Sequence, residues 1–479
     1  MALRPGDVQW LNDEPKLIYY ARNYNTLPSD DYFIHLRFMP AVAGLNGTRG
    51  VLYGPAPVWF YQILWLATHD LIAIAMLHAL FAGVVTALAL FWLARVMRVS
   101  PWLAVLAMLS PWIWYYSRQL WDNNFNIPLS ALLLAAYGDF ITTRRTWSLR
   151  LAVFCMVIMP LVHFMSLPLI IPVAIHLTAF HFRDVWKSKW NLLTIASGIE
   201  FLAWPYWRTL YYAHHTSIPG GLSAVRGWFF PLLGPHHLTG GGMNMLLGDD
   251  WVSGLNVFVG SIVYISQAYS LLAYLICWVG MALAAVCAWR IFIRAGSAST
   301  LDHLAAISLA TWLCQTVLYG FDRAYDGPHY FNATWVIFLV FFWIAIDVIC
   351  RRRSDWRSVL RVGLVLHGAA LITVLAGGYY CIIHNTGSRR EKGYGTTLSN
   401  QIAAMREINR FSAGSPRFIE INQWNSYKWA FDFLQELIPA PPGPRPMAQL
   451  RIHYREDDPD DARIIVDHFP LSTAPSHAP

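Results

Sequence analysis

The sequence predicts an all-α polytopic membrane protein with a small α/β region at its C-terminal end. Apolar residues make up 56% of the 479 positions and charged residues only 13%, proportions unlike those of soluble domains. The charges are also unevenly placed, since residues 384–479 carry 22 of the 63 Asp, Glu, Lys and Arg. We therefore expect three regions: a first outer loop over 1–56, a transmembrane bundle over 57–383, and an extracytoplasmic region over 384–479.

Spanning helices are indicated by runs of roughly 20 mostly apolar residues. Residues 149–182 are long enough for two short spans, because His163 to Pro168 form a polar, proline-containing break that suits a hairpin. The sequence then predicts ten spans, and eleven if another precedes the present chain. The other eight lie near 71–94, 101–117, 125–143, 190–212, 260–289, 301–320, 331–350 and 359–383.

The positions of the basic residues test these predicted spans, because Lys and Arg in short loops stay on the cytoplasmic side of a membrane. Between positions 57 and 383, 15 of them fall at alternate turns and only four at the intervening turns. This alternation predicts that residues 1–56, the turn at 117–124, the loop at 213–255, the turn at 319–330 and the tail share the outer face. The five clusters lie at 95–98, 144–150, 183–189, 290–294 and 351–361.

The remaining segments are assigned by their local patterns. The aromatic run PAPVWFYQILWLAT at 55–68 is too short to span and predicts a helix along the outer surface. The tail combines a helical pattern over 398–411 with the strand-like segments RFIEI, LRIHY and ARIIVDHF. Because the N-terminus has no apolar signal segment, we expect that a first span precedes this chain.

Three function classes receive no support from the sequence. The net charge of +7 comes largely from clusters between apolar runs, where membrane topology explains it, so we expect no nucleic-acid partner. Neither a GxxxxGK[ST] nor a GxGxxG motif occurs in a strand-to-helix context, which argues against ATP-driven transport and soluble nicotinamide chemistry. Chemistry is therefore expected in the outer loops.

Two adjacent carboxylates, Asp13 and Glu14, precede an apolar and aromatic stretch in the first outer loop. Partial desolvation at the membrane surface would raise the pKa of such a carboxylate and make it a useful general base. The structural alternative is a helix N-terminus, with Asn12 or Asp13 as the cap and Glu14 and Pro15 in the first turn. One residue can serve both purposes.

Two outer turns bring further polar residues to the same level. In WYYSRQLWDNNFN, Asp122 follows Arg118 by four positions and would share its face if the segment were helical. These two residues either belong to a site or form an ion pair that closes the turn. In GFDRAYDGPHYFN, Arg323 is suited to a phosphate unless it pairs with Asp322 or Asp326.

The long outer loop raises the question of a metal. It contains His214, His215, His236 and His237 together with a glycine-rich and an acidic stretch. This composition suggests a mobile flap over a substrate or a divalent metal ion, although neither His pair has a recognised ligand spacing. A divalent metal is thus a possible cofactor whose ligands the sequence does not specify.

Several motifs resemble the polytopic lipid-phosphate-dependent glycosyltransferases of the GT-C class, especially the group that is similar to aminoarabinose transferases and protein O-mannosyltransferases. They follow one another in the family's order over roughly residues 10–212. The motifs are Asn12-Asp13-Glu14, GPAPVWFYQIL, SPWIWYYSRQLWDNNFNIPLSALLLAAY and WPYWRTLYYA, with DGPHYFNATWVIFLV as a weaker fifth.

The resemblance implies an enzyme of the inner (plasma) membrane that moves a hexosyl or pentosyl group, with inversion, from a polyprenyl-phosphate donor to an envelope acceptor. It implies Asp13 as the catalytic base, Glu14 as its neighbour and Asp122 as a second acid. It places Arg118 or Arg323, with His329 and Tyr330, near the donor phosphate. The chain departs from the family in having only twelve residues before Asp13, and in having His329 where many relatives have an arginine.

Two other classes remain open at the level of the sequence. A transporter or glycolipid flippase would line a path through the bundle with polar residues, whereas Asp139, Glu200, Asp302 and Asp347 are scattered and mostly close to span ends. A non-catalytic envelope assembly protein would not need the acidic pair. The sugar, the acceptor and the oligomeric state are not specified by the sequence.

Overall fold

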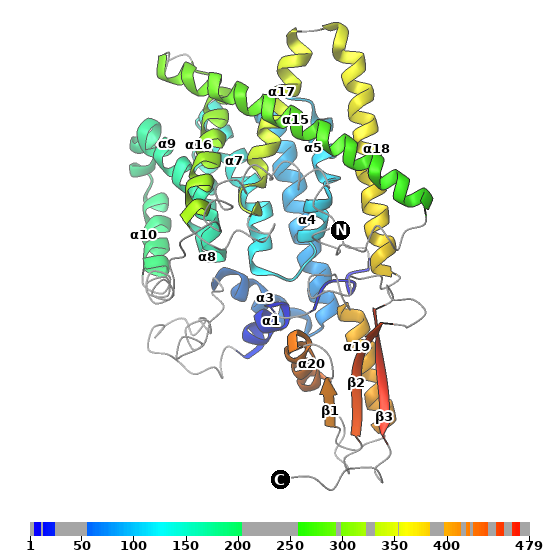
Figure 1. Ribbon diagram of the computed structural model, residues 1–479. Helices are drawn as coiled ribbons and strands as arrows, with labels where there is room; N and C mark the ends of the chain where they lie inside the picture. The colour runs from blue at the N-terminus through cyan, green and yellow to red at the C-terminus, as the bar shows by residue number, and fades with distance from the viewer. Residues whose placement is uncertain are drawn as a thin grey trace.

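Long apolar helices form the body of the protein (Figure 1), for which we use a computed structural model. Six of the described helices are long and apolar enough to cross a bilayer, so the chain is a multi-pass membrane protein. The expected number of ten spans is not confirmed. The described residues are 4–10, 13–23, 55–203, 257–293, 298–321, 331–352, 354–383, 397–412, 418–421, 425–438, 447–454 and 462–469.

The helices of the bundle follow the apolar runs of the sequence. α17 lies at the centre, and its residues Trp335, Val336 and Ile337 are fully buried. α15 packs on α17 so closely that a Cβ atom on Gly280 would lie 1.7 Å from the carbonyl oxygen of Phe341. The bundle comprises α4 (Leu71–Val96), α7 (Asn126–Thr143), α8 (Thr146–Val162), α9 (Leu167–Trp186), α10 (Lys189–Ala203), α15 (Val257–Ile293), α16 (Thr300–Phe321), α17 (Trp335–Arg352) and α18 (Arg357–Ile383).

One expected span is not a single helix. The segment predicted over 101–117 consists of α5 (Pro101–Met108) and α6 (Pro111–Tyr116). Ser110, with ψ of 125°, leaves the helical region because the ring of Pro111 disfavours that conformation in the residue before it. The predicted break at 163–168 is present as the short 3-10 helix η2 (Phe164–Ser166) between α8 and α9.

The C-terminal region contains the expected helix and strands. They are α19 (Leu398–Ser412), β1 (Phe418–Ile421), α20 (Asn425–Leu437), β2 (Met447–Tyr454) and β3 (Ala462–Phe469). The strands form one sheet in the order β1-β2-β3, in which β1 and β2 are parallel and β2 and β3 are antiparallel. The division of the chain into three domains and the extracytoplasmic placement of this region remain predictions.

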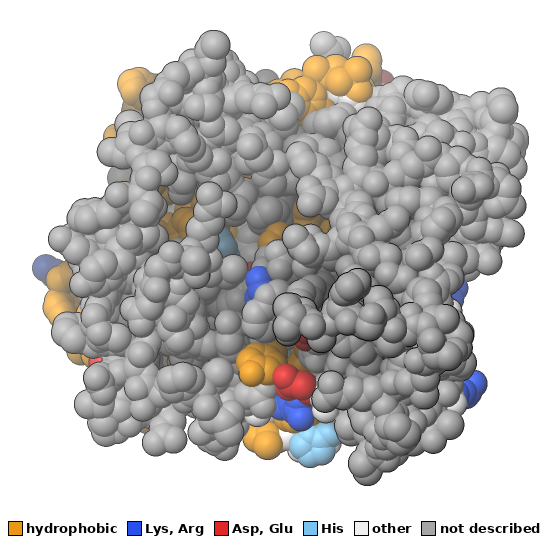
Figure 2. All heavy atoms as spheres, turned by 60° about the horizontal axis from the view of Figure 1, so that its bottom comes forward, with side chains coloured by type: hydrophobic (Ala, Val, Ile, Leu, Met, Phe, Trp, Pro, Cys, Tyr) orange, Lys and Arg blue, Asp and Glu red, His pale blue; other side chains and the backbone are white. Residues whose placement is uncertain are grey.

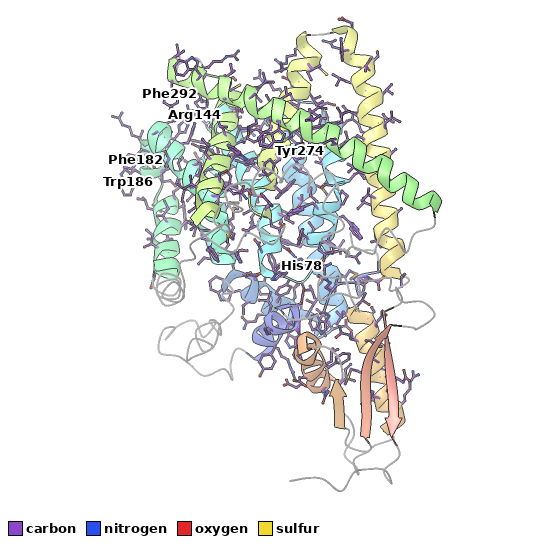
Figure 3. All side chains as sticks on the ribbon, in the orientation of Figure 1. His78, Arg144, Phe182, Trp186, Tyr274 and Phe292 are labelled. Atoms are coloured by element: carbon purple, nitrogen blue, oxygen red, sulfur yellow. The ribbon has the colours of Figure 1, made fainter. Side chains whose placement is uncertain are left out.

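The two ends of the bundle differ in what they carry. The connection between α17 and α18 lies at the top of Figure 1, whereas α1 (Asp13–Asn23), α3 (Pro55–Thr68), α19, α20 and the sheet lie at the bottom. Arg144 and Phe292, labelled in Figure 3, lie in the upper part of the molecule and His78 lies lower. We call these the basic end and the loop end.

Candidate functional site

Helices α1 and α3 lie across the loop end of the bundle. α1 begins at Asp13, so that Glu14 and Pro15 stand in its first turn, as the structural alternative predicted. Leu17 and Ile18 are fully buried and pack in one cluster with Val58 and Tyr61 of α3. Apolar burial thus fixes α1 against α3 and turns Glu14, only 7% exposed, inward.

Tyr61 is a buried residue on which two of the predicted acids act electrostatically. Its hydroxyl lies 3.1 Å from Nδ1 of His78, and both side chains are fully buried. Burial raises the pKa of Tyr61 well above its ordinary value, and the negative charges of Asp122 and Glu14 raise it further. Carboxylates from α1 and from the 3-10 helix η1 (Asp122–Phe125) thus both influence this buried hydroxyl.

Arg118 occupies the turn between α6 and η1. Residues 117–121 are not helical, so the condition under which Arg118 and Asp122 would share a helical face is not met. Instead, Nη2 of Arg118 donates to the carbonyl oxygen of Arg4 at 3.0 Å, and its guanidinium lies 5.1 Å from the Trp114 ring and 5.3 Å from the Tyr379 ring. Such stacking suits a planar guanidinium, and the side chain is only 1% exposed.

An N-terminal segment, residues 4–10, links this turn to the C-terminal region. The backbone N–H of Gln9 donates to Oε1 of Gln119 at 2.8 Å, and the Tyr115 hydroxyl donates to Oε1 of Gln9 at 2.7 Å. On its other side, the segment receives the backbone N–H of Leu398 on the carbonyl of Val8 at 3.0 Å. Nε2 of Gln401 also donates to the carbonyl of Trp10 at 2.7 Å.

A titratable group lies inside this N-terminal segment. Asp7 forms an ion pair with Nε of Arg4 at 2.7 Å, and it is 6% exposed. Burial raises the pKa of Asp7, although the positive charges of Arg4 and Arg118 act in the opposite direction.

Buried amides hold η1, and with it Asp122, in place. Nδ2 of Asn124 donates to the carbonyl of Gln119 at 2.9 Å, and Nδ2 of Asn332 donates to Oδ1 of Asn124 at 3.0 Å. The indole N–H of Trp335 donates to the carbonyl of Ile127 at 3.2 Å. These bonds connect the Asp122 turn to the beginning of α17. A buried network with these contacts is rigid because an unsatisfied amide in a low-dielectric environment is costly.

The structure brings together only part of the predicted site. Glu14, Asp122 and Arg118 all lie buried at the loop end, where acidic, basic and hydrophobic side chains adjoin one another on the described part of the face in Figure 2. Asp13 begins α1, and its side chain lies outside the described residues. Arg323, His329 and Tyr330 also lie outside them, as do the four histidines of the loop at 213–255.

Sequence reasoning missed three members of this group: Tyr61, Gln119 and Asn332. Most of their partners are distant in the sequence, and the amide-rich string DNNFN is the signal that could have pointed to a hydrogen-bonded turn here. With respect to metals, the described part of the chain contains no group of three or more His, Cys, Asp or Glu that could hold an ion.

The span-associated acids behave differently from those at the loop end. Oδ2 of Asp139 accepts from the Ser148 hydroxyl at 2.5 Å, and Asp347 forms an ion pair with Arg351 at 2.9 Å. Asp302 accepts from the backbone N–H of Ser299 at 2.9 Å and caps the start of α16. These three acids thus each have a local partner close to the basic end and need no transport path to explain them, whereas Glu200 in α10 is exposed.

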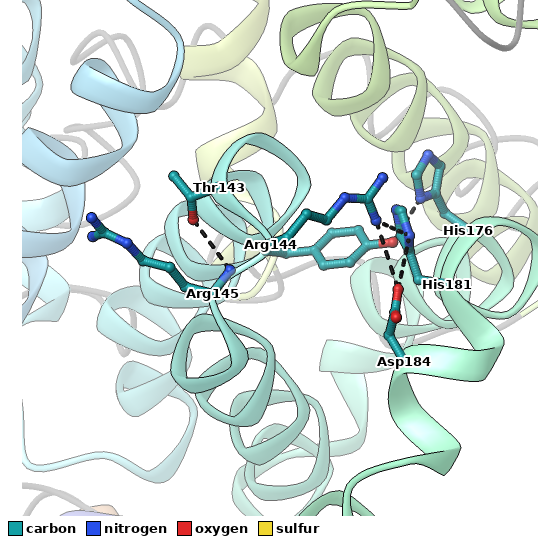
Figure 4. Close-up of polar contacts among 7 residues, drawn as sticks. Thr143, Arg144, Arg145, His176, His181 and Asp184 are labelled. Carbon is teal, nitrogen blue, oxygen red and sulfur yellow. Dashed lines mark hydrogen bonds and ion pairs between the residues drawn. The ribbon is translucent and has the colours of Figure 1, made fainter.

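A second polar group joins three helices near the basic end. Arg144 donates to Nδ1 of His181 at 2.6 Å and lies 3.7 Å from Asp184, as Figure 4 shows. The Tyr137 hydroxyl is 2.7 Å from Nδ1 of His176, whose Nε2 is 2.8 Å from Nδ1 of His303. These contacts tie α7, α9 and α16 together where α9 bends at His181, whose φ is −139°.

Comparisons with known proteins add a structural likeness. No protein-family model and no curated protein matches the chain. The chain is similar to the crystal structure of the Archaeoglobus fulgidus oligosaccharyltransferase in complex with zinc and sulfate, with 13% sequence identity and a TM-score of 0.47. The match covers 91% of this chain and 58% of the other, so the chain spans less than two thirds of that protein's length.

Proposed function

We propose that this protein is an inverting glycosyltransferase that moves a sugar from a polyprenyl-phosphate donor to an envelope acceptor: a lipid, a polysaccharide or a protein. The observation that carries the proposal is the burial of Glu14, Asp122 and Arg118 at the loop end, where both carboxylates act electrostatically on the buried Tyr61 hydroxyl. These carboxylates come from segments far apart in the sequence and lie at the same end of a membrane-spanning bundle. The GT-C resemblance of the motifs around them supports the same conclusion.

The reaction requires a base and a cation. A carboxylate of the Asp13–Glu14 pair takes the proton of the acceptor hydroxyl while its oxygen attacks the anomeric carbon from the face opposite the phosphate. The bond from that carbon to the phosphate oxygen breaks, and polyprenyl phosphate leaves with the electron pair. Because phosphate is a good leaving group, it needs charge stabilisation more than a strong general acid.

The cationic role falls first to Arg118 among the described residues. Its guanidinium is held by the Arg4 carbonyl and by two aromatic rings, so it is orientated before any ligand arrives. Asp122, four positions along the same turn, orients a substrate group or this cation. We assign Arg323, His329 and Tyr330 to the donor phosphate on the resemblance alone.

The site would face away from the cytoplasm in the inner (plasma) membrane. The described residues of the basic clusters, including Arg144, Lys187 and Arg357, flank the connections between helices at the basic end, and the positive-inside rule assigns that end to the cytoplasm. The loop end would then meet a lipid-linked donor and its acceptor at the outer boundary of the bilayer.

The test is sugar transfer by the purified protein in lipid nanodiscs with a panel of labelled polyprenyl-phosphate sugars and membrane-extract acceptors. The variants are Asp13→Asn, Glu14→Gln and Asp122→Asn. The matched control is Asp70→Asn, because Asp70 is exposed and caps α4 through the Ala73 N–H at 2.8 Å, a role that Asn fills equally well.

Loss of the base should lower the rate by about 10² to 10⁴ in one of the two acidic-pair variants, with normal membrane insertion and donor binding. Asp122→Asn should lower the rate and weaken donor binding if it orients the phosphate-binding cation. Full activity in all three variants would remove the mechanism. Absence of transfer from every donor by the unmodified protein would remove the proposed function.

A further inference from the structure

An apolar cavity lies between α15, α17 and α18, away from the loop end. Its volume is about 580 Å³. Phe342 and Ile346 of α17 form one wall, and α15 contributes another with Leu272 and Ile276. Val359, Leu360 and Leu364 of α18 close it, so that the lining is almost wholly hydrocarbon.

The cavity results from the way in which the helices diverge. α17 and α18 spread apart below their connection, and α15 crosses the gap between them (Figure 1). Gly363 of α18 also lines the cavity, and a Cβ atom built on it would meet nothing within 4 Å. At this point the side-chain volume that normally fills the space between packed helices is missing.

The position of the cavity determines what fills it. Most of its lining residues belong to α15 and α18, which are long and apolar enough to cross a bilayer, and an apolar void does not hold water. Leu272 and Val359 at its rim are 50% and 63% exposed, so the cavity opens sideways to the membrane. The molecules that can enter from that side are lipid acyl chains.

Two arginines on the segment of α18 that lines the cavity indicate the charge of the lipid, although neither side chain belongs to the lining itself. Nε of Arg357 donates to the carbonyl of Cys350 at 2.9 Å, which holds its guanidinium at the connection between α17 and α18. Arg361, one turn further along α18, is exposed. Trp356 lines the cavity and is 54% exposed, as expected of an aromatic ring at the headgroup level. Arginine is well suited to a phosphate at such a position.

We propose that this cavity binds one acyl chain of an anionic phospholipid from the leaflet at the basic end, with its phosphate beside Arg357 and Arg361. The site is distinct from the donor site, because Glu14, Asp122 and Tyr61 lie at the loop end. The proposal follows from the cavity and from Arg357 and Arg361 of α18 alone, and it does not depend on the proposed glycosyl transfer.

The decisive variant is Gly363→Leu, which fills the cavity from α18 without meeting a neighbouring atom at its Cβ. Leucine also favours a helix more than glycine does, so the fold should be retained. The matched control is Val365→Leu, two positions away and 71% exposed to the membrane. Val359→Trp is a second filling variant, introduced from the rim.

Each protein is equilibrated with phosphatidylglycerol or phosphatidylcholine in detergent, and bound lipid is counted by native mass spectrometry. The unmodified protein and Val365→Leu should retain phosphatidylglycerol, whereas Gly363→Leu and Val359→Trp should retain at least tenfold less. Arg357→Gln with Arg361→Gln should abolish the preference for phosphatidylglycerol over phosphatidylcholine. The proposal would be overturned if both filling variants retained as much phosphatidylglycerol as the unmodified protein. It would also be overturned if the unmodified protein retained the two lipids equally.

Discussion

The link between the N-terminal segment and the Asp122 turn gives the sharpest test of how the loop end is held together. Replacing Gln119 with Met removes the oxygen that accepts from the Gln9 N–H at 2.8 Å and keeps a side chain of similar length. A buried donor left without its acceptor costs about 1–3 kcal/mol. Because Gln9 is only partly buried, we expect the lower half of this range.

The consequence is measurable at the amide itself. A change of about 1–3 kcal/mol corresponds to about 5- to 150-fold in an equilibrium, so residues 8–10 should open several-fold more often in Gln119→Met. Hydrogen exchange followed by mass spectrometry on peptides that cover these residues measures this opening. Gln119→Glu keeps an accepting oxygen and serves as the matched control. Unchanged exchange of the Gln9 amide in Gln119→Met would refute the view that this bond holds the segment.

Three other predictions address charge, packing and topology. Because burial raises the pKa of Asp7, the N-terminal segment should be held most firmly below the ordinary carboxyl pKa and less firmly as the pH rises through the raised pKa. Protection of its amides from hydrogen exchange, corrected for intrinsic rates, should fall over this pH range. The Asp7→Asn variant should show no such fall. Gly280→Ala should sharply lower the yield of folded protein, because its Cβ would meet the Phe341 carbonyl oxygen, whereas Gly363→Ala should leave the yield unchanged. Equal yields of the two variants by size-exclusion chromatography would contradict the close packing of α15 on α17. Cysteines introduced at Arg361 and Glu436 should label from opposite sides of the membrane, and labelling of both from one side would exclude the topology.

The parts of the fold that sequence could predict are those with a local pattern. α4 and the strands β2 and β3 match the predicted segments closely because apolar length and alternation decide them. The break before Pro111 was missed although the rule for residues that precede proline anticipates it. The site was only partly predictable for a different reason. Glu14 and Asp122 stand out as charges in apolar surroundings, but the sequence gives no sign that both charges act on Tyr61, because that depends on tertiary packing.

The hydrogen bonds at the loop end would hold the proposed catalytic groups with the accuracy that catalysis needs. A base displaced by about 1 Å can lose about 10²-fold in rate, and isolated turns do not provide such accuracy. Here the Asp122 turn is bonded through Asn124 to Asn332 before α17 and through Gln119 to Gln9. The N-terminal segment is bonded in turn to α19. Because the network on η1 consists of neutral amides, it fixes the turn without adding charges that would compete with Asp122 or Arg118 for a substrate. The C-terminal region therefore reaches the proposed site in two ways: through the N-terminal segment, and through α20, whose Phe433 packs against Trp10 and against Tyr19 of α1.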